Sequence, residues 1–273
     1  MSALLFPSAL SVPKALDGRV LLPVLLCAVG AGVVAALGAN ERWFLAANAA
    51  AAGWLPVGVW AGITNMGGTL GAFALLAPTL ARWPRWTAAA LLAAPLASAY
   101  THFFKEFANV PRPAAVLAPE LFQIAGLPLR TSSFPSGHTL TIFVLAGVLV
   151  LCAQRRLAWC FVPVAALVAF SRIAVGAHWP LDVFGGAAGG WAAAACGCAW
   201  SARWRFWEGA GGQRALAALA LAASVTLGFE RPDYPEGLWM QYALCAWGSA
   251  GALFALWRPA AARPAAAPER TGA

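Results

Sequence analysis

A polar stretch over residues 171–182 reads Ser-Arg-Ile-Ala-Val-Gly-Ala-His-Trp-Pro-Leu-Asp within an otherwise apolar sequence. Its guanidinium, imidazole and carboxylate would each be costly to bury without a partner, which predicts a functional cluster. Pro180 suits the first turn of a helix, so Asp182 would lie near that helix's start, within reach of His178. A carboxylate bonded to one imidazole nitrogen fixes the tautomer and leaves the other nitrogen free to attack a substrate. Arg172 adds a planar fork of donors suited to phosphate oxygens. The alternative is a helix cap with a structural ion pair.

A second polar cluster follows an apolar run and contains Lys105 and Arg112, seven residues apart. Such a pair would share one helix face, but Pro111 interrupts the helix and predicts a loop that bends Arg112 back. Taken alone, the pair could be two cations that snorkel at a helix end. His102 lies one turn earlier and is either an interfacial histidine or a substrate contact.

The third cluster is Pro135-Ser136-Gly137-His138, at the start of the next apolar run. Ser is a favoured N-cap, Gly lets the backbone approach an anion, and a helix N-terminus supplies free N–H groups. His138 would then lie where it could give a proton to a leaving oxygen. In isolation, this motif could equally be a capped helix with an interfacial histidine.

Together the clusters hold three cations, two histidines and one carboxylate, which three independent helix caps would not explain. The three cations, with backbone N–H groups near Ser136 and Gly137, could stabilise a transferring phosphoryl group. Few acidic side chains accompany them, so the pattern does not favour a divalent metal site.

The composition predicts a polytopic membrane protein. Of the 273 residues, 61% are hydrophobic and only 10% are charged, against about 25% charged in soluble domains. The net charge of +8 comes from Lys and Arg residues spread singly or in pairs between apolar runs. This spread is typical of topology signals and does not indicate a nucleic-acid surface.

Eight apolar runs predict an all-α bundle of about eight spans, and the first run is long enough by itself to cross a bilayer. The expected spans are 20–39, 67–81, 86–104, 138–153, 157–170, 181–199, 215–229 and 237–257. The first run exceeds the core of a signal peptide, about 15 residues, which favours an uncleaved span. Residues 40–66 are too polar for a span and predict one or two interfacial helices before span two. Three tryptophans would anchor them among the headgroups: Trp43, Trp54 and Trp60.

Basic residues indicate the orientation of these spans. With the N-terminus inside, twelve of the eighteen fall on the cytoplasmic side and six outside, as the positive-inside rule expects. The three polar clusters then open on the same external face, where they can meet.

The three clusters resemble the three-part signature of the type 2 phosphatidic acid phosphatase superfamily, which also includes the vanadium haloperoxidases. The matching residues are Lys105 with six residues before Arg112-Pro113, then Pro135-Ser136-Gly137-His138, then Ser171-Arg172 with five residues before His178 and three more before Asp182. All three parts match in the right order without a substitution. The resemblance covers about residues 40–200, and the last two spans exceed the family's common six-helix plan.

The resemblance implies a role for each matching residue. It implies that His178 is the nucleophile that forms a phosphohistidine and that Asp182 orients it. His138 would be the general acid for the leaving group and then the base for water. Five residues would bind phosphate oxygens: Lys105, Arg112, Ser136, Gly137 and Arg172. No metal or other cofactor is implied.

We therefore expect a lipid phosphate phosphatase at the external (periplasmic) face of a bacterial-type inner membrane. Its substrate could be undecaprenyl diphosphate, phosphatidylglycerophosphate, phosphatidate or lipid A, and the sequence does not choose among them or give the oligomeric state. Alternatives are transfer of the phosphate to another lipid and, with vanadate in the pocket, haloperoxidase activity. The expected organisation is a cytoplasmic arm (1–19), a phosphatase-like membrane core (20–200), two additional spans (201–257) and a disordered tail (258–273).

Overall fold

A computed structural model describes residues 17–153, 156–231 and 233–258, and these residues form only helices and loops. The all-α class expected from the sequence is therefore confirmed. The expected arm and tail lie almost entirely outside the described residues.

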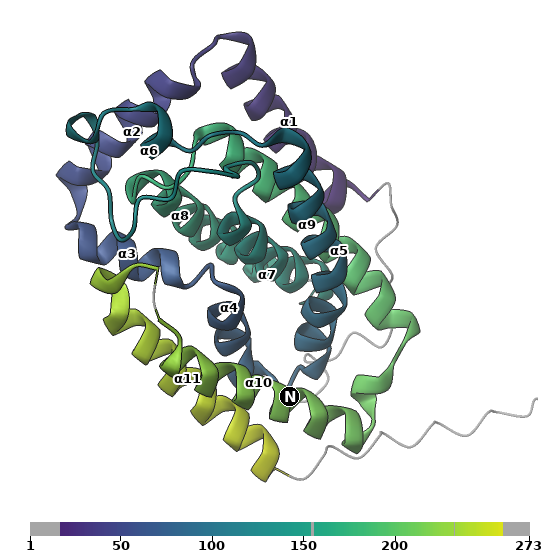
Figure 1. Cartoon of the computed structure of the whole chain (residues 1–273). Helices are drawn as coiled ribbons and strands as arrows, with labels where there is room; N and C mark the ends of the chain where they lie inside the picture. The colour runs from purple at the N-terminus through teal and green to yellow at the C-terminus, as the bar shows by residue number, and fades with distance from the viewer. Residues whose placement is uncertain (1–16, 154–155, 232, 259–273) are drawn as a thin grey trace, which may run out of the picture.

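Four helices form the centre of the bundle (Figure 1): α5 (Pro84–Ala108), α7 (Gly137–Ala153), α8 (Phe161–Ala174) and α9 (Pro180–Arg203). Helix α7 is the most enclosed, since it packs against the other three and most of its side chains are buried. Glycines let α9 approach its neighbours closely. A Cβ atom on Gly190 would lie 2.3 Å from the carbonyl oxygen of Leu140 in α7, and one on Gly197 would lie 2.2 Å from that of Ala89 in α5.

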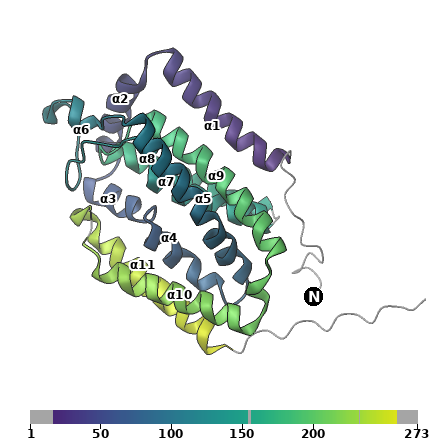
Figure 2. The same ribbon diagram turned by 45° about the vertical axis from the view of Figure 1, so that its right-hand side comes forward.

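Two groups of helices flank this centre, on opposite edges of the bundle (Figure 2). Helix α1 (Gly18–Ala36) packs against α9 on one edge. On the other edge, α10 (Ala210–Phe229) and α11 (Leu238–Trp257) form a hairpin against α4 (Thr69–Leu76) and the short helix η1 (Ala77–Thr79). The hairpin's connecting loop contains η5 (Pro235–Gly237), which packs on α3 (Val57–Asn65).

Within the part of the chain that the structure describes, three helices are long and apolar enough to cross a membrane: Gly18–Ala36, Leu157–Ala174 and Ala210–Phe229. A fourth span is possible if α2 (Asn40–Trp54) and α3, which are bent by 108° at their junction, count as one. The chain is thus a multi-pass membrane protein, whereas the eight spans and the interfacial position of α2 and α3 stay predictions. The hairpin of α10 and α11 covers the two runs expected as additional spans, 215–229 and 237–257, and it packs beside the central helices.

Polar residues of α2 bond to backbone groups of α8, of α9 and of the loop before α7. The Asn48 amide donates to the carbonyl oxygens of Ile173 and Ala174 and accepts from the amide of Gln123. The Asn40 side chain accepts from the Leu181 amide at the start of α9. These bonds explain why this segment is too polar for a simple span: its polar side chains bond to the end of α8, the start of α9 and the loop at Gln123.

The expected headgroup anchor Trp60 is buried, at 1% exposure. Its indole N–H donates to the Ala51 carbonyl at 2.9 Å, inside the angle between α2 and α3. The expectation for this residue was therefore wrong, because the bend turns that face of α3 inward, while Trp54 is 67% exposed.

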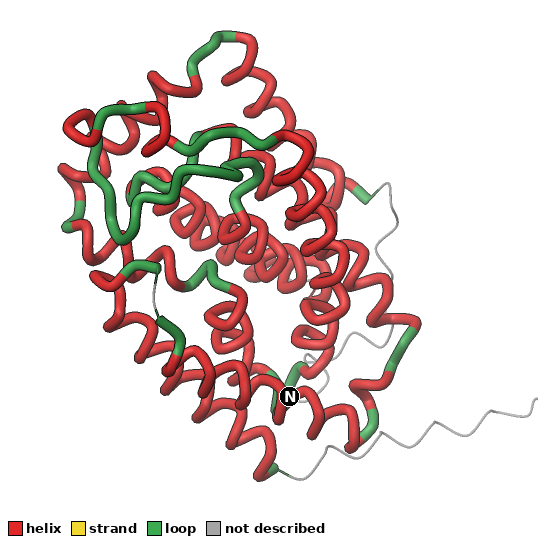
Figure 3. The backbone as a smooth tube through the Cα atoms, viewed as in Figure 1, coloured by secondary structure: helices red, strands yellow, loops and turns green. Residues whose placement is uncertain are grey.

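Loops gather at one end of the bundle, between the end of α5 and the start of α7 (Figure 3). This connection includes α6 (Pro113–Val116) and η2 (Pro119–Leu121). Two further short helices lie elsewhere: η3 (Arg156–Cys160) before α8, and η4 (Phe206–Glu208) before α10. The looped end carries the residues of all three polar clusters.

Candidate active site

The turn between α8 and α9 brings His178 back over the end of α8. Arg172 lies in the last turn of α8, and its carbonyl oxygen accepts from the amides of Ala177 and His178 at 3.0 and 3.2 Å. Gly176 allows this reversal, because its φ of +75° is readily adopted by glycine. Pro180 then begins α9, as the sequence predicts.

His178 and Asp182 form a buried pair, with 2% and 1% of their surfaces exposed. Nδ1 of the imidazole lies 3.2 Å from Oδ2 of the carboxylate. The same oxygen accepts from the Trp179 amide at 2.8 Å and from the Ser133 hydroxyl at 2.5 Å. An ionised carboxylate only accepts, so this contact favours the tautomer with its proton on Nδ1 and the lone pair on Nε2.

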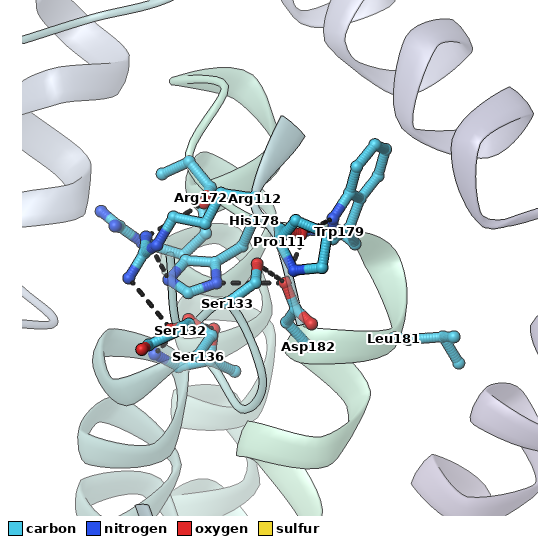
Figure 4. Close-up of polar contacts among 12 residues, drawn as sticks. Pro111, Arg112, Ser132, Ser133, Ser136, Arg172, His178, Trp179, Leu181 and Asp182 are labelled. Atoms are coloured by element: carbon cyan, nitrogen blue, oxygen red, sulfur yellow. Dashed lines mark hydrogen bonds and ion pairs between the residues drawn. The ribbon is translucent and has the colours of Figure 1, made fainter. Parts of the chain in front are cut away.

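Arg112 approaches that lone pair (Figure 4): Nη1 lies 3.2 Å from Nε2 of His178. The loop bends back as expected, because α5 ends at Ala108 and Asn109 adopts a left-handed conformation (φ 38°). The guanidinium is held by carbonyl oxygens, from Nε to Thr131 at 2.9 Å and from Nη1 to Ala177 at 3.1 Å. A buried cation thus lies beside the free nitrogen of the imidazole.

Arg172 is 1% exposed and both of its terminal nitrogens bond to hydroxyl groups. Nη1 donates to Oγ1 of Thr64 at 2.6 Å, and Nη2 donates to the hydroxyl of Tyr234 at 2.7 Å. Its Nε is buried and has no hydrogen-bond partner among the described residues. This leaves a desolvated donor available to a ligand.

The start of α7 differs from the expected anion cradle in one respect. The Ser136 amide donates to the Asp182 carbonyl at 3.0 Å, so this N–H group is not free for phosphate, contrary to the expectation. The Ser136 hydroxyl accepts from the hydroxyl of Thr139 at 3.0 Å. The backbone at Gly137 borders open space, since a Cβ atom there would meet nothing within 4 Å. As the first residue of α7, Gly137 has an amide with no carbonyl partner inside the helix.

Lys105 and the two other histidines lie around this centre. Lys105 is half-buried in the last turn of α5. The His138 ring faces the Tyr234 ring edge-on, with centroids 6.4 Å apart. His102 is exposed and its Nδ1 lies 2.8 Å from the Ser98 carbonyl oxygen.

Burial lowers the pKa of His178 well below its ordinary value, and the charges of Arg112, Arg172 and Lys105 lower it further. Each factor disfavours a positive charge on the imidazole. The ring is therefore neutral near pH 7, the state in which Nε2 can act as a nucleophile.

Two cavities adjoin His138. An apolar groove of about 480 Å³ lies between α4, α5 and α7, with Ala94, Ala97, His102 and Val144 in its walls. A smaller cavity of about 220 Å³ lies between α4 and the α10–α11 loop, and Tyr234 forms part of its lining. His138 thus lies where an apolar chain and a polar site could meet.

Three side chains of this arrangement were not identified from the sequence. Ser133 lies three residues before Ser136, close enough to a recognised motif to be considered. Thr64 and Tyr234 are 108 and 62 residues away from Arg172 and belong to no motif, so the sequence carries no signal for them.

The described residues contain no group of three or more His, Cys, Asp or Glu side chains placed to hold a metal ion. The charged groups gathered here are instead three cations and one carboxylate. Such a set suits an anionic ligand such as phosphate.

Comparison with known proteins gives one family match and a small number of relatives. The sequence model of the PAP2 superfamily matches residues 86–209. This range includes all eight predicted site residues but neither Thr64 nor Tyr234. The chain is similar to the solved structure of LpxE from Aquifex aeolicus, with 29% identity and a TM-score of 0.51 over 57% of this chain and 92% of that one.

Two further proteins are similar, one with a lower TM-score and the other over a short stretch of sequence. The first transmembrane PAP2 type phosphatidylglycerolphosphate phosphatase from Bacillus subtilis is 21% identical with a TM-score of 0.46, over 69% of this chain and 96% of that one. An undecaprenyl-diphosphatase of Sulfolobus acidocaldarius is 43% identical over 54 residues. That match spans 20% of this chain and only 26% of the relative's length.

Proposed function

Because residues 86–209 match the PAP2 superfamily, we propose that this protein removes phosphate from a membrane lipid through a phosphohistidine intermediate. The observation that carries the proposal is the setting of His178, whose Nδ1 contacts Asp182 while Nε2 faces Arg112. One nitrogen is fixed by a carboxylate, and the other is directed at a cation that can hold the phosphate it attacks.

In the first step, Nε2 of His178 attacks phosphorus and the bond from phosphorus to the leaving oxygen breaks. His138 donates a proton to that oxygen, so no negative charge has to build up on the leaving oxygen as the bond breaks. Asp182 stabilises the imidazolium character that develops on His178, as the carboxylate does in other imidazole-dependent sites. In the second step, His138 takes a proton from water, water attacks phosphorus, and the nitrogen–phosphorus bond breaks to release phosphate.

Lys105, Arg112 and Arg172 meet the charge on the transferring group, together with the Gly137 amide and the Ser136 hydroxyl. Preorganised cations and N–H groups stabilise a phosphoryl transition state without reorganising during the reaction. With three cations to neutralise the phosphate oxygens, the proposed reaction needs no metal ion.

The apolar groove beside His138 supports a lipid as the substrate. Its walls are mostly apolar, and it borders the proposed general acid. A prenyl or acyl chain would therefore lie in the groove with its phosphate at His178. We place this site on the external face of a bacterial inner membrane, because that orientation leaves twelve of eighteen basic residues inside.

The test is phosphate release in detergent from undecaprenyl diphosphate, phosphatidylglycerophosphate, phosphatidate and lipid A, for the wild type and His178→Ala. We expect release from at least one lipid, unchanged by EDTA and inhibited by vanadate, and none from the variant. Quenching the wild type with labelled lipid in alkaline detergent should trap a phosphoprotein that is stable to base, labile to acid and absent from the variant. Full activity in His178→Ala, or a strict requirement for added magnesium, would contradict the mechanism.

A further inference from the structure

We propose that Tyr234, on the loop between α10 and α11, is a positioning residue of the phosphate site. It lies outside residues 86–209, so the C-terminal hairpin would complete a site that the superfamily core does not finish alone. The inference rests on the proposed function, since it assigns Tyr234 to the binding of the same phosphate.

Tyr234 contacts two of the proposed site residues from one position. It is 3% exposed, and its hydroxyl accepts from Nη2 of Arg172 at 2.7 Å. The guanidinium carbon lies 5.0 Å from the Tyr234 ring centroid, and the His138 ring meets the same ring edge-on. The phenol therefore lies between a proposed phosphate ligand and the proposed general acid.

The hydrogen bonds of Arg172 show what this contact does. Thr64 holds one terminal nitrogen and Tyr234 holds the other, so two hydroxyl groups fix the plane of the guanidinium. The buried Nε has no partner among the described residues. A buried donor without a partner is uncommon in proteins and needs an explanation, which a bound phosphate would supply. A fixed guanidinium would direct this donor at one place, where a phosphate oxygen would accept from it.

The loop that carries Tyr234 is held on two sides. The Gly237 carbonyl accepts from the Asn65 side chain at 2.9 Å, and the Trp239 indole donates to the Gly58 carbonyl at 3.2 Å. On the other side, a Cβ atom on Gly126 would lie 2.1 Å from the Asp233 carbonyl oxygen, so only glycine permits this approach. These contacts tie the loop to α3 and to the loop before α7. The hairpin thus presents Tyr234 in a defined position.

The test compares Tyr234→Phe with Tyr242→Phe. Both remove one phenol hydroxyl from the same hairpin, but Tyr242 is 54% exposed. Losing a hydrogen bond to a charged group is expected to lower kcat/KM about 10-fold. In Tyr234→Phe, we expect the lower kcat/KM to come from a higher KM, and we expect the inhibition constant for vanadate to rise as well. The loss should be the same for a lipid phosphate and for soluble p-nitrophenyl phosphate, because the contact acts on the phosphate. Tyr242→Phe should match the wild type.

Misfolding would give a different result, since a smaller active fraction lowers kcat and leaves KM unchanged. That outcome, or equal KM and vanadate inhibition in the two variants, would overturn the proposal.

A second measurement uses Arg172→Lys, which cannot form the same fork. In the Arg172→Lys background, Tyr234→Phe should change kcat/KM by less than about 2-fold, because the effects of mutations at two contacting residues do not add. Fully additive effects of the two substitutions would contradict the inference. If the wild type releases no phosphate from any lipid, the proposed function fails instead.

Discussion

Nη1 of Arg112 lies 3.2 Å from Nε2 of His178, the imidazole nitrogen that Asp182 does not contact. Without substrate, the guanidinium donates to the lone pair that the proposed mechanism uses for attack. Carbonyl oxygens of Thr131 and Ala177 hold Arg112 in place. With little movement of the Arg112 side chain, Nη1 could therefore donate to a phosphate oxygen instead of to His178. The lone pair of Nε2 would then be free to attack phosphorus.

The pH dependence of activity should reveal this relationship. Burial and then three cations, Arg112 first, hold the pKa of His178 below its ordinary value. Replacing Arg112 with Gln removes one of these charges, so the pKa of His178 should rise. Because only the neutral imidazole can attack, the acid limb of the kcat/KM profile should move to higher pH. The variant should also lose activity, about 10- to 100-fold, with the lost charged hydrogen bond.

The matched control is Arg42→Gln, which removes an exposed cation of α2. Its pH profile should coincide with that of the wild type. An acid limb in Arg112→Gln that stays in place or moves to lower pH would show that Arg112 does not influence the nucleophile.

Much of the site could be predicted from the sequence because its residues lie at helix ends with local signals. Pro180 begins α9, and Gly137 begins α7. The resemblance to the type 2 phosphatidic acid phosphatases is confirmed by the superfamily match. The roles given to individual residues stay predictions.

The remaining features depend on contacts between distant segments. Thr64 and Tyr234 meet Arg172 only after α3 packs against α8 and the hairpin's loop packs on α3, and no local pattern encodes that meeting. The use of the Ser136 amide by the Asp182 carbonyl could not be foreseen for the same reason. Trp60 was misplaced because a sharp bend reverses the exposure that composition alone suggests.

Ser133→Ala should weaken the support of Asp182. The Ser133 hydroxyl donates to the carboxylate oxygen that also faces His178. Its loss leaves a buried carboxylate with fewer donors, and we expect kcat to fall about 10-fold with KM nearly unchanged. Ser132→Ala is the control, because Ser132 offers its carbonyl oxygen to Arg112 and an alanine keeps that atom. Equal kcat values in the two variants would exclude this support.

The groove between α4, α5 and α7 should select for the lipid chain. Ala94 lines it from α5, and a phenylalanine there would fill part of its 480 Å³. Ala94→Phe should raise KM for a long-chain lipid phosphate about 10-fold or more, since each CH₂ kept from burial costs about 0.8 kcal/mol. Hydrolysis of p-nitrophenyl phosphate should not change. Ala99→Phe, on an exposed face of the same helix, should behave as the wild type. Equal losses on both substrates would indicate damage to the phosphate site instead.

Close packing of α9 against α7 should control the site geometry as well as stability. A Cβ atom on Gly186 would lie 2.5 Å from the Ser136 carbonyl oxygen, so Gly186→Ala must push the start of α7 away from α9. That shift would strain the bond from the Ser136 amide to the Asp182 carbonyl. We expect a loss of about 1–3 kcal/mol of stability and a fall in kcat larger than the unfolded fraction explains. Thermal unfolding in detergent measures the stability, and an activity assay on the same sample measures kcat.

Gly53→Ala is the control, because a Cβ atom there meets nothing within 4 Å, and it should leave stability and kcat unchanged. A stable Gly186→Ala protein with wild-type kcat would show that the start of α7 can shift without moving the proposed acid.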